Sequence, residues 1–520
     1  MTRFQHSQIL YSLLTLTILA SCDGVFPEGN GVFSSENMTT YQTALTPQVP
    51  YLNQNYLLPS LTSPSPTVTW SVSTGMIADG IYQYVSPQED QTVTFTATLS
   101  SQGETRTLEF PMSIQSQLHV PEVSKRPILN LTLANGKREA DIFYEDYLNA
   151  TASLTMDRNG EVITQSIPSP LGIRTRGHST RFMPKRPYRI RFEQNTSLFG
   201  MKAAKNYILL ANYLDHSLVR NSLVTYMSKF YSTMYTLDYR FVDLKINQTY
   251  FGQYLLIERV EFHPNRLNIE PDLTKDDAGF MIELDYQVYV QNQGNENLEW
   301  FRMNDTPYAI KEPNPLDPDI GYQFRHTRFI NNFLHSTRDA LISRTNYADY
   351  LDTENWLDYF LIQEITKNVD VGWGSVYLVK PSGEKIKHMP LWDFDLAIGL
   401  AEYDDIKVMD DPDGHWGWAT YEKNYLFTLL MKIPAMRQRF REKLADYHTR
   451  VLPKIDQWLD DNLSRMTALS AANFEVWPMN SCSGWCPIST NIRDAQTMNQ
   501  QFDYLSQFLH TRVDWMMANI

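Results

Sequence analysis

The spacing of apolar residues changes along this chain, and that change limits the folds open to it. In residues 67–72 and 92–99, apolar side chains alternate with polar ones, which predicts strands that bury one face. Near the C-terminus, apolar residues recur every three or four positions instead, at Met498, Phe502, Leu505, Leu509, Val513 and Met516. This spacing predicts an amphipathic helix whose apolar stripe lies in the core. Strand-like segments followed by helical ones predict an α+β fold.

The length of 520 residues predicts more than one domain, since compact domains hold about 150 residues each. Residues 23–49 are rich in Ser, Thr, Gln and Asn and predict a flexible tether. Several short alternating segments in residues 50–118 predict a small all-β sandwich. Residues 120–520 contain no repeat and no long linker, so we expect them to form the main domain. The net charge of −14 argues against a general nucleic-acid binder, and we expect no nucleic-acid partner.

The small domain carries a specific pattern. Its segments TWSVST, DGIYQYVSP, QTVTFTATL and GETRTLEFPMSI resemble those of bacterial immunoglobulin-like domains. The resemblance implies that Trp70 is the core tryptophan of the sandwich. Such a domain is a spacer or a binding module, and we assign it no chemistry.

The first 22 residues have the features of an export signal. Arg3 precedes an apolar stretch at residues 9–20, which is too short to span a bilayer. The stretch ends in Leu-Ala-Ser-Cys22, which resembles a bacterial lipobox, so residues 1–22 predict a lipoprotein signal with lipidation at Cys22. We therefore expect a protein of the bacterial cell envelope, anchored to a membrane through its acyl chains. A plain signal peptide with a chance Cys is the alternative.

Two further cysteines, Cys482 and Cys486, lie close together near the C-terminus. An exported protein meets an oxidising compartment, which favours a disulfide between them. Free thiols and a zinc site are the alternatives, although this pair supplies only two of the four ligands that structural zinc needs.

A basic segment stands out in this acidic protein. Residues 174–191 hold seven Lys or Arg, among them Arg174, Arg176, Lys185 and Arg189. Tyr, Ile and Phe alternate with Arg along part of it, so one strand face is apolar and the other cationic. Guanidinium and ammonium groups suit phosphate oxygens. A solvated strand face paired with surface carboxylates is the alternative.

Two glutamates lie in apolar strand-like segments. Glu258 ends the second strand of a predicted hairpin, and Glu283 is enclosed by apolar residues. A carboxylate placed in this way needs a cationic partner. Taken alone, each glutamate fits a structural ion pair.

Carboxylates also follow an apolar run later in the chain. Asp393 and Asp395 lie two residues apart, so they can point the same way. Together with the amide oxygen of Asn368 they predict a hard oxygen site suited to Mg²⁺ bound to a nucleotide. Asp370 is then free to orient or deprotonate an acceptor hydroxyl. Turn capping is the alternative, since short Asp-x-Asp motifs are common.

Taken in order, RTRGHSTR, PKRPYRIRF, YILLANYLDHSLVRN, VDLKINQTYFGQYLLIE, NVD, SVYLV and WDFDLAIG resemble the CotH (spore coat protein H) kinase family over residues 170–400. The resemblance implies a divergent, two-lobed protein-kinase-like domain. It also implies an atypical protein kinase that uses ATP and Mg²⁺ or Mn²⁺ to phosphorylate Ser, or Thr, of protein substrates that the sequence does not identify.

The resemblance also implies roles for single residues. Asp370 becomes the catalytic Asp and Asp393 a metal ligand, while Lys185 lies in the basic, nucleotide-facing strand with Glu258 or Glu283 as its partner. His178 occupies a position where many members have Asn, and the chain has no G-x-G-x-x-G loop.

Two other functions stay open. ATP is scarce outside the cytoplasm, so the domain could instead be a non-catalytic envelope binding protein with a kinase-like fold. A metal-dependent glycosyltransferase could use residues 393–395, but it requires an upstream βαβ nucleotide domain that the strand-rich segment 170–285 does not predict.

Overall fold

The computed structural model of the chain describes residues 32–47, 51–52, 56–61, 66–78, 80–83, 91–114, 127–158, 161–401, 423–479 and 486–520. The chain divides into two compact units, Met1–Gln117 and Leu118–Ile520. The predicted signal peptide, Cys22 and Cys482 lie outside the described residues. In the described part, no helix is both long and apolar enough to cross a membrane.

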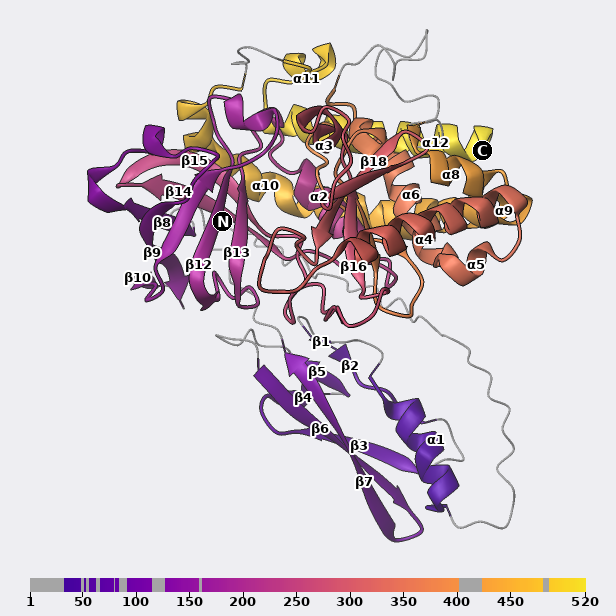
Figure 1. Cartoon of the computed structure of the whole chain (residues 1–520). Coiled ribbons are helices and arrows are strands. Elements are labelled where there is room, and N and C mark those ends of the chain that lie inside the picture. The colour runs from indigo at the N-terminus through magenta and orange to yellow at the C-terminus, as the bar shows by residue number, and fades with distance from the viewer. Residues whose placement is uncertain are drawn as a thin grey trace. The chain divides into compact units, whose positions relative to one another are not determined.

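The first unit contains a four-stranded sheet, of order β1-β7-β6-β3, and a three-stranded sheet, of order β2-β5-β4 (Figure 1). Alternate residues of β6 are buried in one apolar core, as the period-two pattern predicts. The strands are β1 (Tyr51–Leu52), β2 (Tyr56–Leu57), β3 (Thr67–Val72), β4 (Met76–Ala78), β5 (Ile81–Gln83), β6 (Gln91–Ser101) and β7 (Glu104–Ile114).

Helix α1 (Ser35–Leu45) occupies part of the predicted tether. The Ser34 side chain accepts a hydrogen bond from the Asn37 amide at 3.3 Å and so caps the helix. Tyr41 and Leu45 are buried in the core of the first unit. The prediction of a flexible segment is wrong for these residues, because two apolar side chains four positions apart share one helix face and dock it.

Trp70 packs at the margin of this core. It lies on β3, one of the two edge strands of the four-stranded sheet, and is partly buried. Its Nε1 donates to the Pro59 carbonyl oxygen at 2.9 Å, and its ring centroid lies 5.6 Å from that of Phe110. The immunoglobulin-like character of the unit stays a prediction.

Seven strands of the second unit close into a barrel, which the sequence pattern does not predict. The order is β9-β11-β12-β13-β15-β14-β8, and β8 pairs with β9 again. Neighbours are antiparallel except β8 and β14, and β10 extends the sheet from β9. The strands are β8 (Ile128–Leu133), β9 (Leu148–Arg158), β10 (Glu161–Ser166), β11 (Leu171–Thr175), β12 (Tyr188–Thr196), β13 (Ala204–Leu210), β14 (Tyr239–Ile246) and β15 (Thr249–Glu258).

The barrel core confirms the alternation predicted for the basic segment. Tyr188, Ile190 and Phe192 of β12 are buried in the barrel. Arg189 and Arg191 alternate with them, so their side chains lie on the other face of the strand. The predicted hairpin that ends at Glu258 is the β14–β15 pair.

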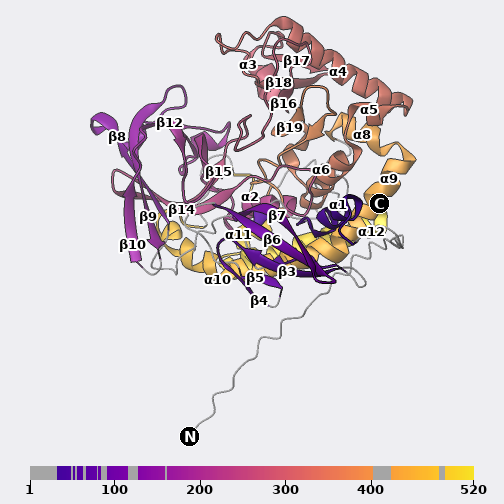
Figure 2. The same ribbon diagram turned by 90° about the horizontal axis from the view of Figure 1, so that it is seen from below.

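The rest of the unit is a five-stranded antiparallel sheet, of order β17-β18-β16-β19-β20, with helices around it; Figure 2 shows this part beside the barrel. The strands are β16 (Phe280–Leu284), β17 (Trp300–Met303), β18 (Thr306–Glu312), β19 (Val376–Lys380) and β20 (Lys387–His388). The α-helices are α2 (Arg220–Ser228), α3 (Tyr286–Gln291), α4 (Phe324–Ser343), α5 (Tyr347–Tyr350), α6 (Thr353–Thr366), α8 (Tyr425–Met431), α9 (Pro434–Asp446), α10 (Leu452–Val476), α11 (Thr490–Asp494) and α12 (Met498–Asn519).

Two helices tie the parts of this unit together. Helix α2 connects β13 to β14 of the barrel, yet its apolar residues are buried in the large core of the helical part. Helix α12 buries the predicted apolar stripe, and Arg512 on it pairs with Glu364 of α6 at 3.1 Å. The α+β class is thereby confirmed. The kinase-like arrangement in two lobes stays a prediction.

Candidate active site

One cavity of about 910 Å³ in the second unit brings most of the predicted site residues together. It is lined by residues of the barrel and by residues that follow α6 and β20. The predicted residues in its lining are Arg174, Arg176, Lys185, Arg189, Glu283, Asp370, Asp393 and Asp395. Glu258 and Asn368 do not line it.

Asp370 is held in a short 3-10 turn, Val369–Gly372, just after α6. The buried Asn368 caps this turn, because its Oδ1 accepts from the Asp370 amide at 3.2 Å. The amides of Trp373 and Gly374 donate to the Asp370 carbonyl oxygen at 2.8 and 3.0 Å. The backbone of Asp370 is thus fixed while its side chain lines the cavity, and the predicted metal ligand Asn368 acts as a cap.

Asp393 has a left-handed backbone, with φ of 66°. Its Oδ2 accepts a hydrogen bond from Ser375 Oγ at 3.0 Å. The next amide, of Phe394, donates to Asn221 Oδ1 at 2.8 Å, and the Phe394 ring is buried. With the intervening Phe394 turned into the core, Asp393 and Asp395 both line the cavity, as their spacing predicts.

The three aspartates Asp370, Asp393 and Asp395 are here called the carboxylate group, and repulsion within the group acts on Asp370 and Asp395. Burial and then the Asp393 charge raise the pKa of Asp370 to about 7, although Lys423 acts against them. The pKa of Asp395 lies well above its usual range, first because of burial and then because of Asp393 and Asp370. Partly buried acidic side chains that repel one another in this way favour a cation between them.

The chemistry of the carboxylate group fits Mg²⁺ or Mn²⁺ that arrives with phosphates. Mg²⁺ is usually held by one or two carboxylates together with substrate phosphate oxygens and water. In the described part of the chain, no three His, Cys, Asp or Glu side chains form a complete metal site by themselves. Asp393 and Asp395, which both line the cavity, are the residues that would supply the one or two carboxylates.

Four arginines line the same cavity, namely Arg174, Arg176, Arg189 and Arg259. Three of them, Arg174, Arg189 and Arg259, are here called the arginine group. Burial, then Arg259 and later Arg174, lower the pKa of Arg189 to about 10. The Nε atoms of Arg174 and Arg189 are buried and have no hydrogen-bond partner. Crowded cations with unused donors are suited to a polyanion such as a phosphate chain. The sequence did not single out Arg259, although it directly follows Glu258.

The Lys185 ammonium is directed into the protein. Only 1% of this residue is exposed, and its Nζ donates to the Gln253 carbonyl oxygen at 2.5 Å and to Asn473 Oδ1 at 2.9 Å. Burial lowers its pKa to about 7. Since Asn473 belongs to α10, Lys185 links that helix to the barrel. None of its described partners is Glu258 or Glu283.

Both strand glutamates have cationic partners of their own. Glu258 pairs with the buried Arg266 at 2.7 Å, away from the cavity. Glu283 pairs with Lys311 at 2.8 Å in the cavity wall. The prediction that each needs a cation is confirmed, but the sequence did not identify either partner. Lys311 lies near the end of β18, directly after the apolar run Tyr308–Ile310.

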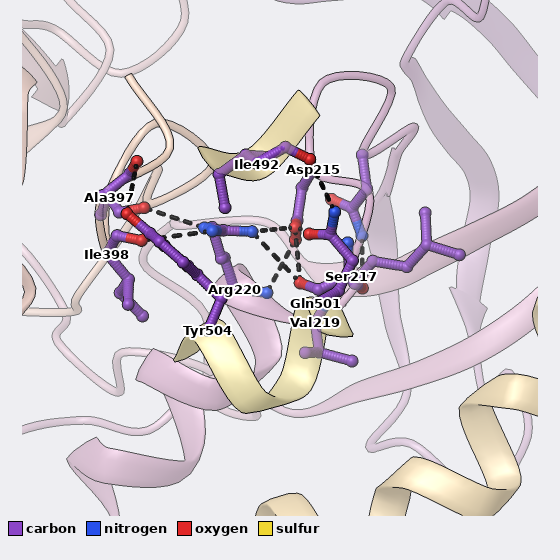
Figure 3. A network of polar contacts seen from close by, with 12 residues as sticks. Asp215, Ser217, Val219, Arg220, Ala397, Ile398, Ile492, Gln501 and Tyr504 are labelled. Atoms are coloured by element: carbon purple, nitrogen blue, oxygen red, sulfur yellow. Dashed lines mark hydrogen bonds and ion pairs between the residues drawn. The ribbon is translucent and has the colours of Figure 1, made fainter. Parts of the chain in front are cut away.

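Arg220 and Asp215 form an ion pair 2.5 Å apart, and both side chains are fully buried. Figure 3 shows this pair and the contacts around it. Arg220 also donates from Nε to the Ala397 carbonyl oxygen at 2.9 Å, and from Nη2 to that of Ile398 at 3.2 Å. Tyr504 of α12 donates to the neighbouring Gly399 carbonyl oxygen at 3.3 Å. The loop that carries Asp393 is therefore held from two sides.

A family model described as CotH kinase protein matches residues 173–516, which is more than half of the chain. The chain belongs to this CotH kinase family. The match runs from β11 into α12 and so includes the carboxylate group and the arginine group. The resemblance seen in the sequence is confirmed. No curated protein matches the chain.

Proposed function

We propose that this CotH kinase domain transfers the γ-phosphoryl group of ATP to a Ser or Thr hydroxyl of a protein substrate. One observation carries the proposal: the arginine group and the carboxylate group line the same cavity. A nucleotide triphosphate with its metal presents the complementary charges to both groups. Phosphoryl transfer depends on positioning and electrostatics, and these groups supply both.

In this mechanism the arginine group binds the phosphate oxygens, and Asp393 and Asp395 would hold Mg²⁺ or Mn²⁺. When bound, the ion neutralises charge on the transferring group. Asp370 orients the acceptor hydroxyl and takes its proton as the oxygen bonds to the γ-phosphorus. The bond from that phosphorus to the β–γ bridging oxygen breaks, and ADP leaves.

The test is incubation of the purified protein with γ-³²P-ATP and Mn²⁺ or Mg²⁺, with and without a Ser-rich acceptor protein. Label transferred to the acceptor or to the protein itself supports the proposal. Calorimetry without acceptor separates kinase from non-catalytic binding protein. If ATP binds neither with nor without the metal, the proposal is wrong.

We also propose export and anchoring to a membrane of the bacterial cell envelope through Cys22. Cys486 is disulfide-bonded, which suits an oxidising compartment. Its predicted partner, Cys482, lies outside the described residues. Metabolic labelling with palmitate tests the anchor, because label should enter the wild-type protein but not Cys22→Ala. Equal labelling of both would contradict it.

A further inference from the structure

The backbone of residues 393–400 lies outside the strands and helices, yet it carries two of the three carboxylates. Its polar groups therefore depend on partners from elsewhere in the fold. The first turn of α2 supplies several of them, through Arg220 and Asn221, here called the α2 clasp. Asn221 accepts from the Phe394 amide at 2.8 Å, and Arg220 donates to two carbonyl oxygens three and four residues further on.

The Arg220 side chain of the α2 clasp is held in place by Asp215. Asp215 neutralises the Arg220 guanidinium and is itself held by the Ser217 hydroxyl at 2.6 Å and by the Arg220 amide at 2.8 Å. Arg220 and Asp215 have no exposed side-chain surface. Burying an ion pair costs desolvation that its own attraction barely offsets, so such a pair is weak as a source of stability. The remaining donors of the guanidinium form hydrogen bonds with the loop carbonyl oxygens. We infer that the pair serves to hold the loop in place.

The α2 clasp is also linked to the barrel through the chain, because α2 lies between β13 and β14. Helix α2 follows β13, and β13 pairs with β12, the strand that carries Arg189. The loop bearing Asp393 and Asp395 is thus fixed to the element that positions part of the arginine group.

We propose that Arg220 and Asn221 are positioning residues, which set Asp393 and Asp395 at a fixed place relative to the arginine group. The proposal rests on the proposed function and concerns two residues to which sequence patterns assign no role. Both act through the loop backbone. Their loss should loosen the loop and weaken metal-dependent nucleotide binding without unfolding the domain.

The test compares Asn221→Ala with Thr225→Ala in the full chain. Thr225 lies one turn further along α2, is also buried, and donates only to the Asn221 carbonyl oxygen at 2.8 Å. Amide hydrogen exchange of residues 393–400 should quicken about tenfold in Asn221→Ala, the effect of leaving a buried donor without its partner. It should stay at the wild-type rate in Thr225→Ala. Asn221→Asp keeps an acceptor for the Phe394 amide and should restore slow exchange.

A second measurement links the clasp to the site. The Mn²⁺-dependent part of ATP binding, measured by calorimetry, should weaken about tenfold in Asn221→Ala while metal-free binding is unchanged. Exchange at the wild-type rate in Asn221→Ala, or equal quickening in Thr225→Ala, overturns the proposal even if the protein is an active kinase. Absence of nucleotide binding in the wild type refutes the proposed function instead. The exchange experiment then still tests whether Asn221 holds the loop in place.

Discussion

The Glu283 carboxylate and the Lys311 ammonium lie 2.8 Å apart in the wall of the cavity that also contains the carboxylate group. Asp285 lies 3.4 Å from the same ammonium. Burial raises the pKa of Glu283, and Lys311 opposes that shift. The pair connects β16 to β18, so it combines a structural role with a place at the candidate site.

Removal of Lys311 should destabilise the fold, because Glu283 would keep a buried charge without its main partner. We expect Lys311→Met to lower the free energy of unfolding by about 2 kcal/mol, less than for a fully buried pair because Lys311 is partly exposed. A double-mutant cycle with Glu283→Gln, by urea denaturation, should show positive coupling. Arg450→Met breaks an exposed pair and should cost less than about 1 kcal/mol. Equal costs would argue against a special role for the cavity pair.

Loss of the Asp393 charge should remove transfer without removing the fold. We expect Asp393→Asn to lower the rate of phosphoryl transfer by at least about a hundredfold, comparable to the loss of one preorganised group that stabilises a transition state. The matched control is Asp503→Asn, at an exposed position of α12. Initial rates with γ-³²P-ATP and thermal melts of both variants provide the measurement. A folded Asp393→Asn protein as fast as wild type would contradict the metal assignment.

Replacement of one member of the arginine group should weaken binding of a phosphate chain. Arg189→Met should reduce affinity for tripolyphosphate roughly ten- to a hundredfold, because a charged donor is lost. It should not reduce stability, since it also relieves repulsion by Arg174 and Arg259. Calorimetry at two salt concentrations measures the affinity. Arg191→Met is the control, since Arg191 lies two residues along the same strand and does not line the cavity. The same loss in both variants would contradict a specific site.

Acid should destabilise the protein through His388. Burial lowers the pKa of this histidine to about 3. Below about pH 6.5 the unfolded chain binds a proton at His388 that the folded protein does not bind. The free energy of unfolding therefore falls as the pH falls, by up to about 1.4 kcal/mol per pH unit. In His388→Gln the free energy of unfolding should depend less on pH, because unfolding then takes up about one proton fewer. Denaturant melts between pH 4 and 7 test this, with His335→Gln, at a less buried position, as the control. An unchanged slope in His388→Gln would contradict it.

Sequence patterns predicted the local elements well, because periodicity reports which face of a strand or helix is buried. The alternation around Ile190 and the apolar stripe of α12 both correspond to buried residues in the structure. The closed barrel was not predicted, because closure depends on which strands pair. Strand β8 pairs with β14, which lies more than 100 residues further along the chain. Helix α1 was missed because its few apolar residues lie in a polar composition.

The candidate site was predicted in part for a similar reason. Motif spacing indicated that Asp393 and Asp395 could point the same way, and the family resemblance added Asp370; all three line one cavity. Side-chain partners were not predictable, because they are set by tertiary contacts. Lys185 is turned toward Asn473 of α10, and Glu283 meets Lys311 instead. Arg220 is part of the family motif YILLANYLDHSLVRN. A single sequence does not indicate to which carbonyl oxygens it donates hydrogen bonds.

Barrel closure has a consequence for how this chain folds as it emerges N-terminus first. Leu129 of β8 lies opposite Leu244 of β14. The first strand of the barrel therefore cannot complete its pairing until β14, one of the last strands, has been synthesised. Contacts between such distant residues form slowly, because the intervening chain must lose much of its freedom first. Until then β8 can pair with β9, but its other edge, which pairs with β14 in the finished barrel, has no partner. A chaperone that shields nascent strands should therefore matter most before β14 has emerged.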